Sequence, residues 1–286
     1  MQKITIFINK FSELVMFKHS VFSLPFIFIA MVVAQNGWFG WRLFIFGLLA
    51  AVSARNFAMG VNRYLDKDID ILNPRTKNRP SVDGRVSDFE MLAFIVINAL
   101  IFITIAYFIN SLAFSLSFPI LIVLGAYTLF KRFSSLAHLI LGISLGLAPI
   151  AGVVAVLGEV TIWSLFLAFG VMFWVAGFDL LYSLQDIDFD KKHNLHSIPS
   201  KFGVENTMKI AKVFHIFTIL LWILFIIKAS LGIFAWIAIV LSAIMLGYEH
   251  YLIKKDFAKI DKAFFIVNGY LGFMFLFMII LDIIIN

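Results

Sequence analysis

Aspartates recur at intervals of four residues in two distant parts of the chain. The first series is Asn62, Asp66 and Asp70, and the second contains Asp186 and Asp190. Residues four apart lie on one face of an α-helix, so each series is expected to present its carboxylates together. Such hard oxygen ligands suit Mg²⁺, which commonly binds a few carboxylates together with substrate phosphates. The spacing therefore predicts that Asp66, Asp70, Asp186 and Asp190 ligate Mg²⁺ ions that bridge a diphosphate.

Two more side chains extend the second series. Asp179 and Tyr182 precede Asp186 on the same helical face. Tyr182 is a candidate to steady a diphosphate oxygen or a developing cation, although tyrosine is also common at membrane interfaces. The alternative for every acid is that it is a solvated loop residue. That role suits the acids outside the regular spacing, which are Asp68, Asp83, Asp88 and Asp188. Regularly spaced carboxylates at a membrane edge favour a functional role.

An arginine lies about two turns inside an apolar segment, on the same face as the first series. An unpaired guanidinium is unfavourable there, so Arg55 requires an anion. That anion is either a protein carboxylate such as Asp66 or the carboxylate of a substrate held bidentately. Basic residues also follow the acids, and Arg79 and Lys131 are the candidates to contact diphosphate oxygens. Orientation of the protein in the membrane is the alternative explanation for both.

The composition places these residues in a membrane protein. Of the 286 residues, 62% are hydrophobic and 14% are charged, whereas a soluble domain is about half apolar and roughly a quarter charged. The chain has no cysteine, which excludes disulfides, cysteine-ligated metals and cysteine nucleophiles. The net charge of +6 comes from lysines and arginines between apolar segments. That pattern suits membrane lipid and membrane orientation, and no nucleic-acid partner is expected.

The apolar segments predict a single all-α integral membrane domain over residues 1–286. About nine of them are long enough to be transmembrane helices, and we expect these to surround a central cavity. They cover approximately residues 19–36, 41–63, 89–109, 112–130, 135–157, 160–183, 209–227, 230–252 and 262–284. Residues 1–18 are expected to form an amphipathic helix that lies in the membrane interface.

The connecting segments alternate between rich and poor in lysine and arginine. Because positively charged connections stay cytoplasmic, the N-terminus is predicted to be cytoplasmic and the C-terminus outside, in a bacterial-type inner membrane. The two longest polar connections, 64–88 and 184–208, are then both cytoplasmic loops. Each carries an aspartate pair followed by a proline and a glycine. This similarity indicates a weak internal duplication with a site between the halves.

Several of these segments resemble the UbiA superfamily of intramembrane prenyltransferases. NRYLDKDID (62–70) and DLLYSLQDIDFD (179–190) are similar to its two Asp motifs, and KNRPSVDG (77–84) and KFG (201–203) to flanking segments. The resemblance implies that Asn62 and the four spaced aspartates bind Mg²⁺ and diphosphate. It implies a diphosphate contact for Lys131 and a place at the same pocket for Asp179 and Tyr182. It also implies that Arg55 holds the carboxylate of an aromatic acceptor.

The resulting hypothesis is a Mg²⁺-dependent polyprenyl transfer from prenyl diphosphate to a hydroxylated aromatic acid of the 4-hydroxybenzoate type, in ubiquinone or menaquinone synthesis. A ring carbon ortho to a hydroxyl would attack the allylic cation, with Asp66 or Asp186 as the catalytic base. An alternative acceptor is 1,4-dihydroxy-6-naphthoate, from the futalosine route to menaquinone. An alternative from another class is an ion-coupled transporter, which predicts acids near mid-bilayer on broken helices. Acids at helix ends beside basic segments favour the enzyme.

Overall fold

The computed structural model describes residues 10–15 and 24–286, and within these ranges the chain is helical without any β-strand. Eight helical spans in this part of the chain are long and apolar enough to cross a membrane. Their main helices are α3 (Trp41–Leu65), α5 (Asp88–Ile109), α6 (Ser111–Ala126), α7 (Ala137–Leu157), α8 (Ile162–Tyr182), α10 (Ile198–Lys228), α11 (Ile233–Lys255) and α13 (Asn268–Ile285). The predicted all-α integral membrane fold is therefore confirmed. The predicted orientation of the termini stays a prediction.

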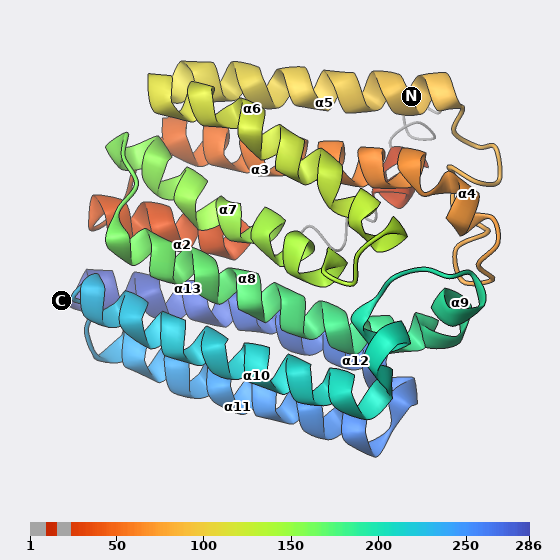
Figure 1. Ribbon diagram of the computed structural model, residues 1–286. Helices are drawn as coiled ribbons and strands as arrows, with labels where there is room; N and C mark the ends of the chain where they lie inside the picture. The colour runs from red at the N-terminus through yellow and green to blue at the C-terminus, as the bar shows by residue number, and fades with distance from the viewer. Residues whose placement is uncertain (1–9, 16–23) are drawn as a thin grey trace.

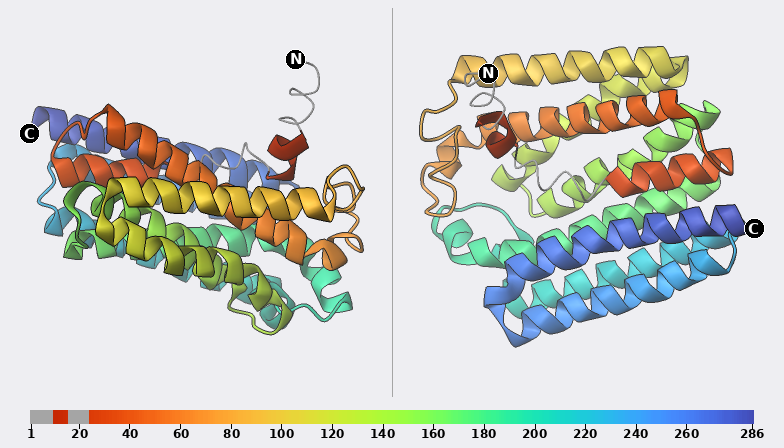
Figure 2. Two further views of the ribbon diagram at one scale, coloured as in Figure 1. Left: turned by 90° about the horizontal axis from the view of Figure 1, so that it is seen from above. Right: turned by 180° about the vertical axis from the view of Figure 1, so that it is seen from behind.

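A shorter helix, α2 (Leu24–Gln35), corresponds to the first predicted segment, whose beginning lies outside the described residues. It packs between α7 and α13 in the middle of the bundle (Figures 1 and 2). Its Phe26 is fully buried and contacts the rings of Trp174 and Trp222, with centroids 5.0 and 5.4 Å away. These aromatic contacts join α2 to α8 and α10, so the main core lies in this half of the molecule.

Small residues allow α7 and α8 to approach each other closely. A Cβ atom at Gly142 would stand 2.3 Å from the carbonyl oxygen of Met172, and one at Gly146 would stand 2.8 Å from that of Ala168. Glycines four apart on one helix face commonly let membrane helices pack backbone to backbone. This close packing brings Asp179, near the end of α8, beside His138 of α7.

Both aspartate series interrupt their helices. Helix α3 ends at Leu65, and a separate short helix, α4 (Lys67–Asp70), follows Asp66. Helix α8 ends at Tyr182 and continues through a 3₁₀ turn, Ser183–Asp186, into α9 (Ile187–Lys192). Asp66 and Asp186 stand at the two breaks with nearly the same backbone angles, φ −92°, ψ 5° and φ −101°, ψ 6°. Both breaks lie at one end of the bundle, and the C-terminus lies at the other (Figure 1).

The segments expected as loops are therefore partly helical. Residues 64–88 contain α4, and residues 184–208 contain α9 and the beginning of α10. Helix α10 begins at Ile198 because the Ser197 side chain accepts a hydrogen bond from the backbone N–H of Ser200. Gly203, with φ 76°, kinks this first stretch against the rest of α10. A left-handed φ of this kind favours glycine.

The described part of the predicted interfacial helix is short. Residues 10–14 are helical, and Phe11 and Leu14 are buried against Val86 and Met91. Lys10 forms an ion pair with Glu90 over 2.8 Å. This segment therefore packs beside the beginning of α5, while the rest of 1–18 lies outside the described residues.

Candidate functional site

One cavity of about 350 Å³ lies where the two helix breaks meet. Its walls come from α3, α4 and the following loop, from the 3₁₀ turn Tyr127–Arg132 that ends α6, and from α7, α8 and α9. Every residue proposed from the sequence lines this cavity. These are Arg55, Asn62, Asp66, Asp70, Arg79, Lys131, Asp179, Tyr182, Asp186 and Asp190. The arrangement brings together side chains that are more than a hundred residues apart in the chain.

Asp66 is the most tightly held of the acids, and its side chain is 2% exposed. Its Oδ2 accepts hydrogen bonds from Asn62 Nδ2 at 2.7 Å and Thr128 Oγ1 at 2.7 Å. Lys131 Nζ lies 2.6 Å from the same oxygen. The second carboxylate oxygen, Oδ1, is buried and accepts no hydrogen bond. Asp66 therefore retains one acceptor atom that a cation could use.

Asp70 and Asp186 are both paired with arginines of the loop that follows α4. Arg79 Nη1 lies 2.6 Å from Asp70 Oδ2. Arg75 binds Asp186 through two nitrogens, Nε at 3.1 Å and Nη2 at 2.6 Å, and Asn73 donates to the same carboxylate at 3.3 Å. The loop after the first aspartate series therefore contacts the second series directly.

The electrostatic effect of this contact is clear at Arg75. Burial would lower the pKa of its guanidinium, but the hydrogen bonds and charge of Asp186 outweigh burial and raise the pKa above its ordinary value. Arg75 also lies over the Tyr182 ring, with Cζ 5.6 Å from the centroid, and donates to the Tyr182 hydroxyl at 3.3 Å. Arg75 therefore contacts both Asp186 and Tyr182 within the cavity.

Asp190 and Asp179 contact a serine and a histidine, respectively. Ser197 Oγ, the N-cap of α10, donates to Asp190 Oδ2 over 2.7 Å. His138 Nδ1 lies 2.7 Å from Asp179 Oδ2. His138 was not among the residues chosen from the sequence, but it lines the cavity and positions one of its acids. Its contact joins α7 to α8, and no spacing along one helix could have indicated it.

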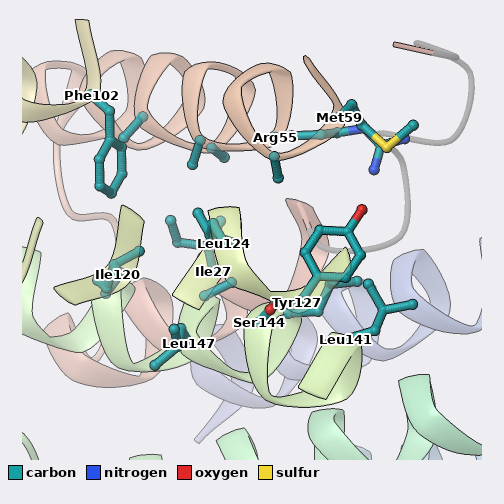
Figure 3. Close-up of a pocket in the computed structure, with 17 residues that line it drawn as sticks. Ile27, Arg55, Met59, Phe102, Ile120, Leu124, Tyr127, Leu141, Ser144 and Leu147 are labelled. Atoms are coloured by element: carbon teal, nitrogen blue, oxygen red, sulfur yellow. The ribbon is translucent and has the colours of Figure 1, made fainter. Parts of the chain in front are cut away.

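Arg55 lies where the polar cavity joins a second, mainly apolar cavity of about 130 Å³. Both cavities are lined by Arg55, Met59 and Tyr127, and Figure 3 shows the Tyr127 hydroxyl directed toward Arg55 and Met59. Tyr127, like Arg75 and His138, was not among the residues chosen from the sequence. It lies four residues before Lys131 in the 3₁₀ turn Tyr127–Arg132, where three residues make one turn, so this spacing does not place the two side chains on one face.

The apolar cavity continues deeper into the bundle. A third cavity, of about 50 Å³, shares lining residues with the second, namely Ile27, Ala50, Phe102, Ile120 and Ala151. It reaches Gly47, eight residues from Arg55 along α3, which corresponds to about 12 Å of helix. Apolar space therefore extends from the charged site toward the opposite end of α3.

The donor set fits Mg²⁺ that is shared with a phosphate ligand. Within the residues that the structure describes, no three His, Asp or Glu side chains converge closely enough to hold an ion by themselves. Mg²⁺ usually needs only one or two carboxylates when phosphate oxygens and water complete its octahedron. Such oxygens are available at Asp66 Oδ1, which accepts no hydrogen bond and lies 3.9 Å from Arg132 Nη2, and at the exposed part of Asp186.

Asp68, an acid outside the regular spacing, lies on the surface of the protein. Asp68 binds Arg132 through both carboxylate oxygens at 2.7 and 2.9 Å. These hydrogen bonds hold the pKa of Asp68 below its usual value. Asp68 does not line the cavity, in agreement with the solvated position expected for it.

The chain is similar to known proteins along most of its length. The model of the UbiA prenyltransferase family matches residues 23–279. The chain is similar to the 4-hydroxybenzoate octaprenyltransferase of Janthinobacterium sp. (strain Marseille), with 27% identity over 245 residues that cover 85% of each protein. The protein of the same name from Herminiimonas arsenicoxydans is 28% identical over 209 residues, which are 73% of this chain and 72% of the relative.

Solved structures resemble the fold. The apo structure of a UbiA homolog from Aeropyrum pernix K1 superposes with a TM-score of 0.84 at 31% identity, covering 92% of this chain and 98% of that one. A UbiA homolog from Archaeoglobus fulgidus bound to GPP and Mg²⁺ gives a TM-score of 0.75 at 21% identity, covering 95% of this chain and 99% of that one.

Proposed function

This chain belongs to the UbiA prenyltransferase family, and from that premise we propose that it transfers a polyprenyl group from a prenyl diphosphate to a hydroxylated aromatic acid. The observation that carries the proposal is the single cavity lined by both aspartate series, which opens past Arg55 into apolar space. A diphosphate, an isoprenoid chain and an acceptor carboxylate each find matching surroundings there. Family membership favours this enzyme over an ion-coupled transporter.

The polar cavity is the proposed diphosphate site. Asp66, Asp70, Asp186 and Asp190 would hold Mg²⁺, which supplies Lewis-acid neutralisation of the diphosphate when bound. Lys131, Arg79 and Arg75 reach the same cavity with cationic groups. Asn62 holds Asp66 in place through its hydrogen bond. Arg75 donates hydrogen bonds to both Tyr182 and Asp186 and so links these two residues. The cationic groups of Lys131, Arg79 and Arg75 would neutralise the diphosphate leaving group as the allylic C–O bond breaks.

The apolar cavities are the proposed site of the isoprenoid chain. Their walls near Arg55 come largely from small residues of α3, which are Ala50, Ala51, Ala54 and Ala58. Small side chains leave room along the helix, and the lining has no charged group besides Arg55. Exclusion of water from this region would protect an allylic cation from hydrolysis.

Arg55 is proposed to bind the acceptor carboxylate. It lines both the polar and the apolar cavity, and the first carbon of a prenyl diphosphate would lie beside it if the diphosphate occupies the polar cavity and the chain the apolar one. A bidentate contact with a carboxylate would present the acceptor ring beside that carbon. The ring carbon ortho to the hydroxyl forms the new C–C bond, diphosphate leaves with the electrons of the C–O bond, and Asp66 or Asp186 accepts the ring proton.

The acceptor we propose is 4-hydroxybenzoate, within respiratory quinone synthesis in a bacterial-type cytoplasmic membrane. The names of the relatives support it. The alternative 1,4-dihydroxy-6-naphthoate also carries a hydroxyl and a carboxylate, so Arg55 suits both acceptors.

The test is a turnover measurement with purified protein, Mg²⁺ and geranyl diphosphate, offering each of the two acids in separate reactions. Mass spectrometry of the products identifies the acceptor. Asp66→Asn and Asp186→Asn should each abolish turnover, whereas Asp188→Asn, which changes an acid outside the cavity, should retain it. Turnover by the first two variants at the unaltered rate would refute the assigned roles.

A further inference from the structure

A second polar–apolar site lies outside the cavities described above, on the surface between α10 and α11. This groove has a volume of about 870 Å³ and shares no lining residue with the polar cavity. Figures 1 and 2 show both helices at the edge of the bundle, away from α5 and α6. Ile216 and Leu220 on its rim are about half exposed. The groove therefore faces the surroundings of the protein and not the reaction site.

The groove has two chemically different halves. Lys209, Lys212 and Lys254 line it at the end of the bundle that carries the aspartate series. Farther along, the lining is apolar and includes Ile219, Ala243, Leu246 and Gly247. Between the halves, His215 and His250 form a hydrogen bond of 3.0 Å that connects the two helices. The site thus offers cations at one end and apolar surface at the other.

Only one of the three lysines in the groove is paired with an acid of the described residues. Glu205 is the acid in the lining, and it pairs with Lys209 over 2.7 Å. Among the described residues, no carboxylate lies within ion-pair distance of Lys212 or Lys254. Lys212 and Lys254, which line the same groove from α10 and α11, therefore remain for an external anion.

The dimensions match one leaflet of a membrane. From Lys254 to Ala243 the groove follows eleven residues of α11, and from Lys212 to Leu220 it follows eight residues of α10. These lengths correspond to about 16 and 12 Å of helix, close to half of the ~30 Å hydrocarbon core. Gly247 leaves open space in the apolar half, because a Cβ atom there would meet no atom within 4 Å.

We infer that this groove binds an anionic phospholipid, with its phosphate group between Lys212 and Lys254 and an acyl chain along Gly247. Basic pockets between membrane helices are suited to such head groups. The charge of the lysines selects for a net negative head group, and the apolar half selects for a chain of one leaflet. The inference does not depend on the proposed reaction.

The experiment measures lipid retention by the purified full-length protein. The protein is incubated in mixed micelles of phosphatidylglycerol and phosphatidylcholine with identical acyl chains, and native mass spectrometry counts the lipids that remain bound. Wild-type protein should retain one phosphatidylglycerol in preference to phosphatidylcholine. The double variant Lys212→Gln/Lys254→Gln should lose this preference by roughly tenfold or more.

A control variant removes the same charge at the same end of the molecule. Lys201→Gln/Lys262→Gln changes two lysines outside the groove and should keep the wild-type preference. Gly247→Phe fills the apolar half while keeping both lysines, and it should also lose the lipid. Thermal unfolding checks that each variant is folded, and Ala243→Leu serves as a second filling variant.

Four outcomes would overturn the inference. Equal loss in the control variant would mean that general surface charge attracts the lipid. Retention of phosphatidylglycerol by the folded filling variants would place the lipid elsewhere. Displacement of the lipid by equimolar geranylgeranyl diphosphate would make the groove a substrate site. A dimer that Gly247→Phe dissociates would show that a second copy of the chain covers it.

Discussion

Three of the four spaced aspartates are paired with a basic side chain from another element. Lys131 contacts Asp66, Arg79 contacts Asp70, and Arg75 contacts Asp186. A diphosphate would attract the cations and a metal ion would attract the carboxylates. Bound alone, Mg²⁺ would leave the basic side chains without their anions, and diphosphate would leave the carboxylates without their cations. Bound together, the two ligands give new partners to the basic side chains and to the carboxylates.

Mg²⁺ and diphosphate should therefore bind cooperatively. Calorimetric titration with inorganic pyrophosphate should show at least about tenfold weaker binding after the metal is removed with EDTA, and the affinity should return when Mg²⁺ is restored. Equal pyrophosphate affinity with and without Mg²⁺ would argue against the proposed sharing of the site.

Substitution of Arg55 should separate the two substrates. Loss of a bidentate charge-assisted contact should raise the KM for the aromatic acid by roughly ten- to a hundredfold in Arg55→Ala, with a much smaller change for the prenyl diphosphate. Lys131→Ala should show the reverse pattern. Steady-state kinetics with each substrate varied in turn gives both values, and a larger effect of Arg55→Ala on the diphosphate KM would contradict the assignment.

The sequence identified the acids because i, i+4 spacing is a property of one helix. Arg75, Tyr127 and His138 were missed because their contacts join different elements, and periodicity along one helix carries no information about those contacts. The internal ion pairs were missed for the same reason. Arg79 and Lys131 were expected near the acids, but only the fold reveals that Arg79 contacts Asp70 and Lys131 contacts Asp66.

At the scale of elements, the alanine-rich face of α3 gives the prenyltransferase its apolar space. Ala50 lines both apolar cavities and lies five residues before Arg55 on α3. A large side chain there would shorten the space without touching the polar site. Chain-length tolerance is therefore a property of this helix face.

Ala50→Phe should retain turnover with geranyl diphosphate and lose about tenfold or more with longer prenyl diphosphates. Leu49→Phe, at a neighbouring position that is 47% exposed, should keep the wild-type profile. Relative rates over a series of donors provide the measurement. A uniform loss with every donor would place the isoprenoid chain outside these cavities.

The close contact of α7 and α8 should be sensitive to a single methyl group. A Cβ at Gly142 would stand 2.3 Å from a backbone oxygen, so Gly142→Ala should destabilise the fold by about 1–3 kcal/mol. Gly247→Ala adds the same methyl group in open space and should preserve or raise the unfolding temperature. Thermal unfolding in detergent compares the two, and equal midpoints would contradict the packing argument.

Hydropathy located the helices well, because each apolar segment must span the same thickness of lipid. It located their ends less well at polar stretches. Helix α10 begins eleven residues before its predicted start, since residues 198–208 are too polar to be recognised as part of a span. Ser197 followed by Pro199 was a usable N-terminal signal. The breaks at Asp66 and Asp186 had no such signal.

For the whole molecule, the charge distribution predicts which end faces the cytoplasm. The end that carries both aspartate series also carries the basic loop with Arg75 and Arg79, and the C-terminus lies at the opposite end (Figure 1). Prenyl diphosphates are anionic, and an opening on the cytoplasmic side would give them direct access to the cavity.

The absence of cysteine from the sequence makes this orientation measurable. In intact cells, an impermeant maleimide should label Ser230→Cys, in the connection between α10 and α11, but not Lys77→Cys in the basic loop. Both variants should react after the cells are permeabilised. Labelling of Lys77→Cys in intact cells would reverse the predicted topology.

The twin breaks at Asp66 and Asp186 have equal backbone geometry but unequal surroundings. The partners of Asp66 lie within membrane-spanning segments, whereas Asn73 and Arg75, which hold Asp186, belong to a connecting loop. Asp66 is therefore held by the membrane-spanning segments, whereas Asp186 is held by a loop from the first half of the chain. Replacing the loop that carries Asn73 and Arg75 with the loop of a relative should change the rate at which diphosphate is released. The position at which diphosphate binds beside Asp66 should stay the same.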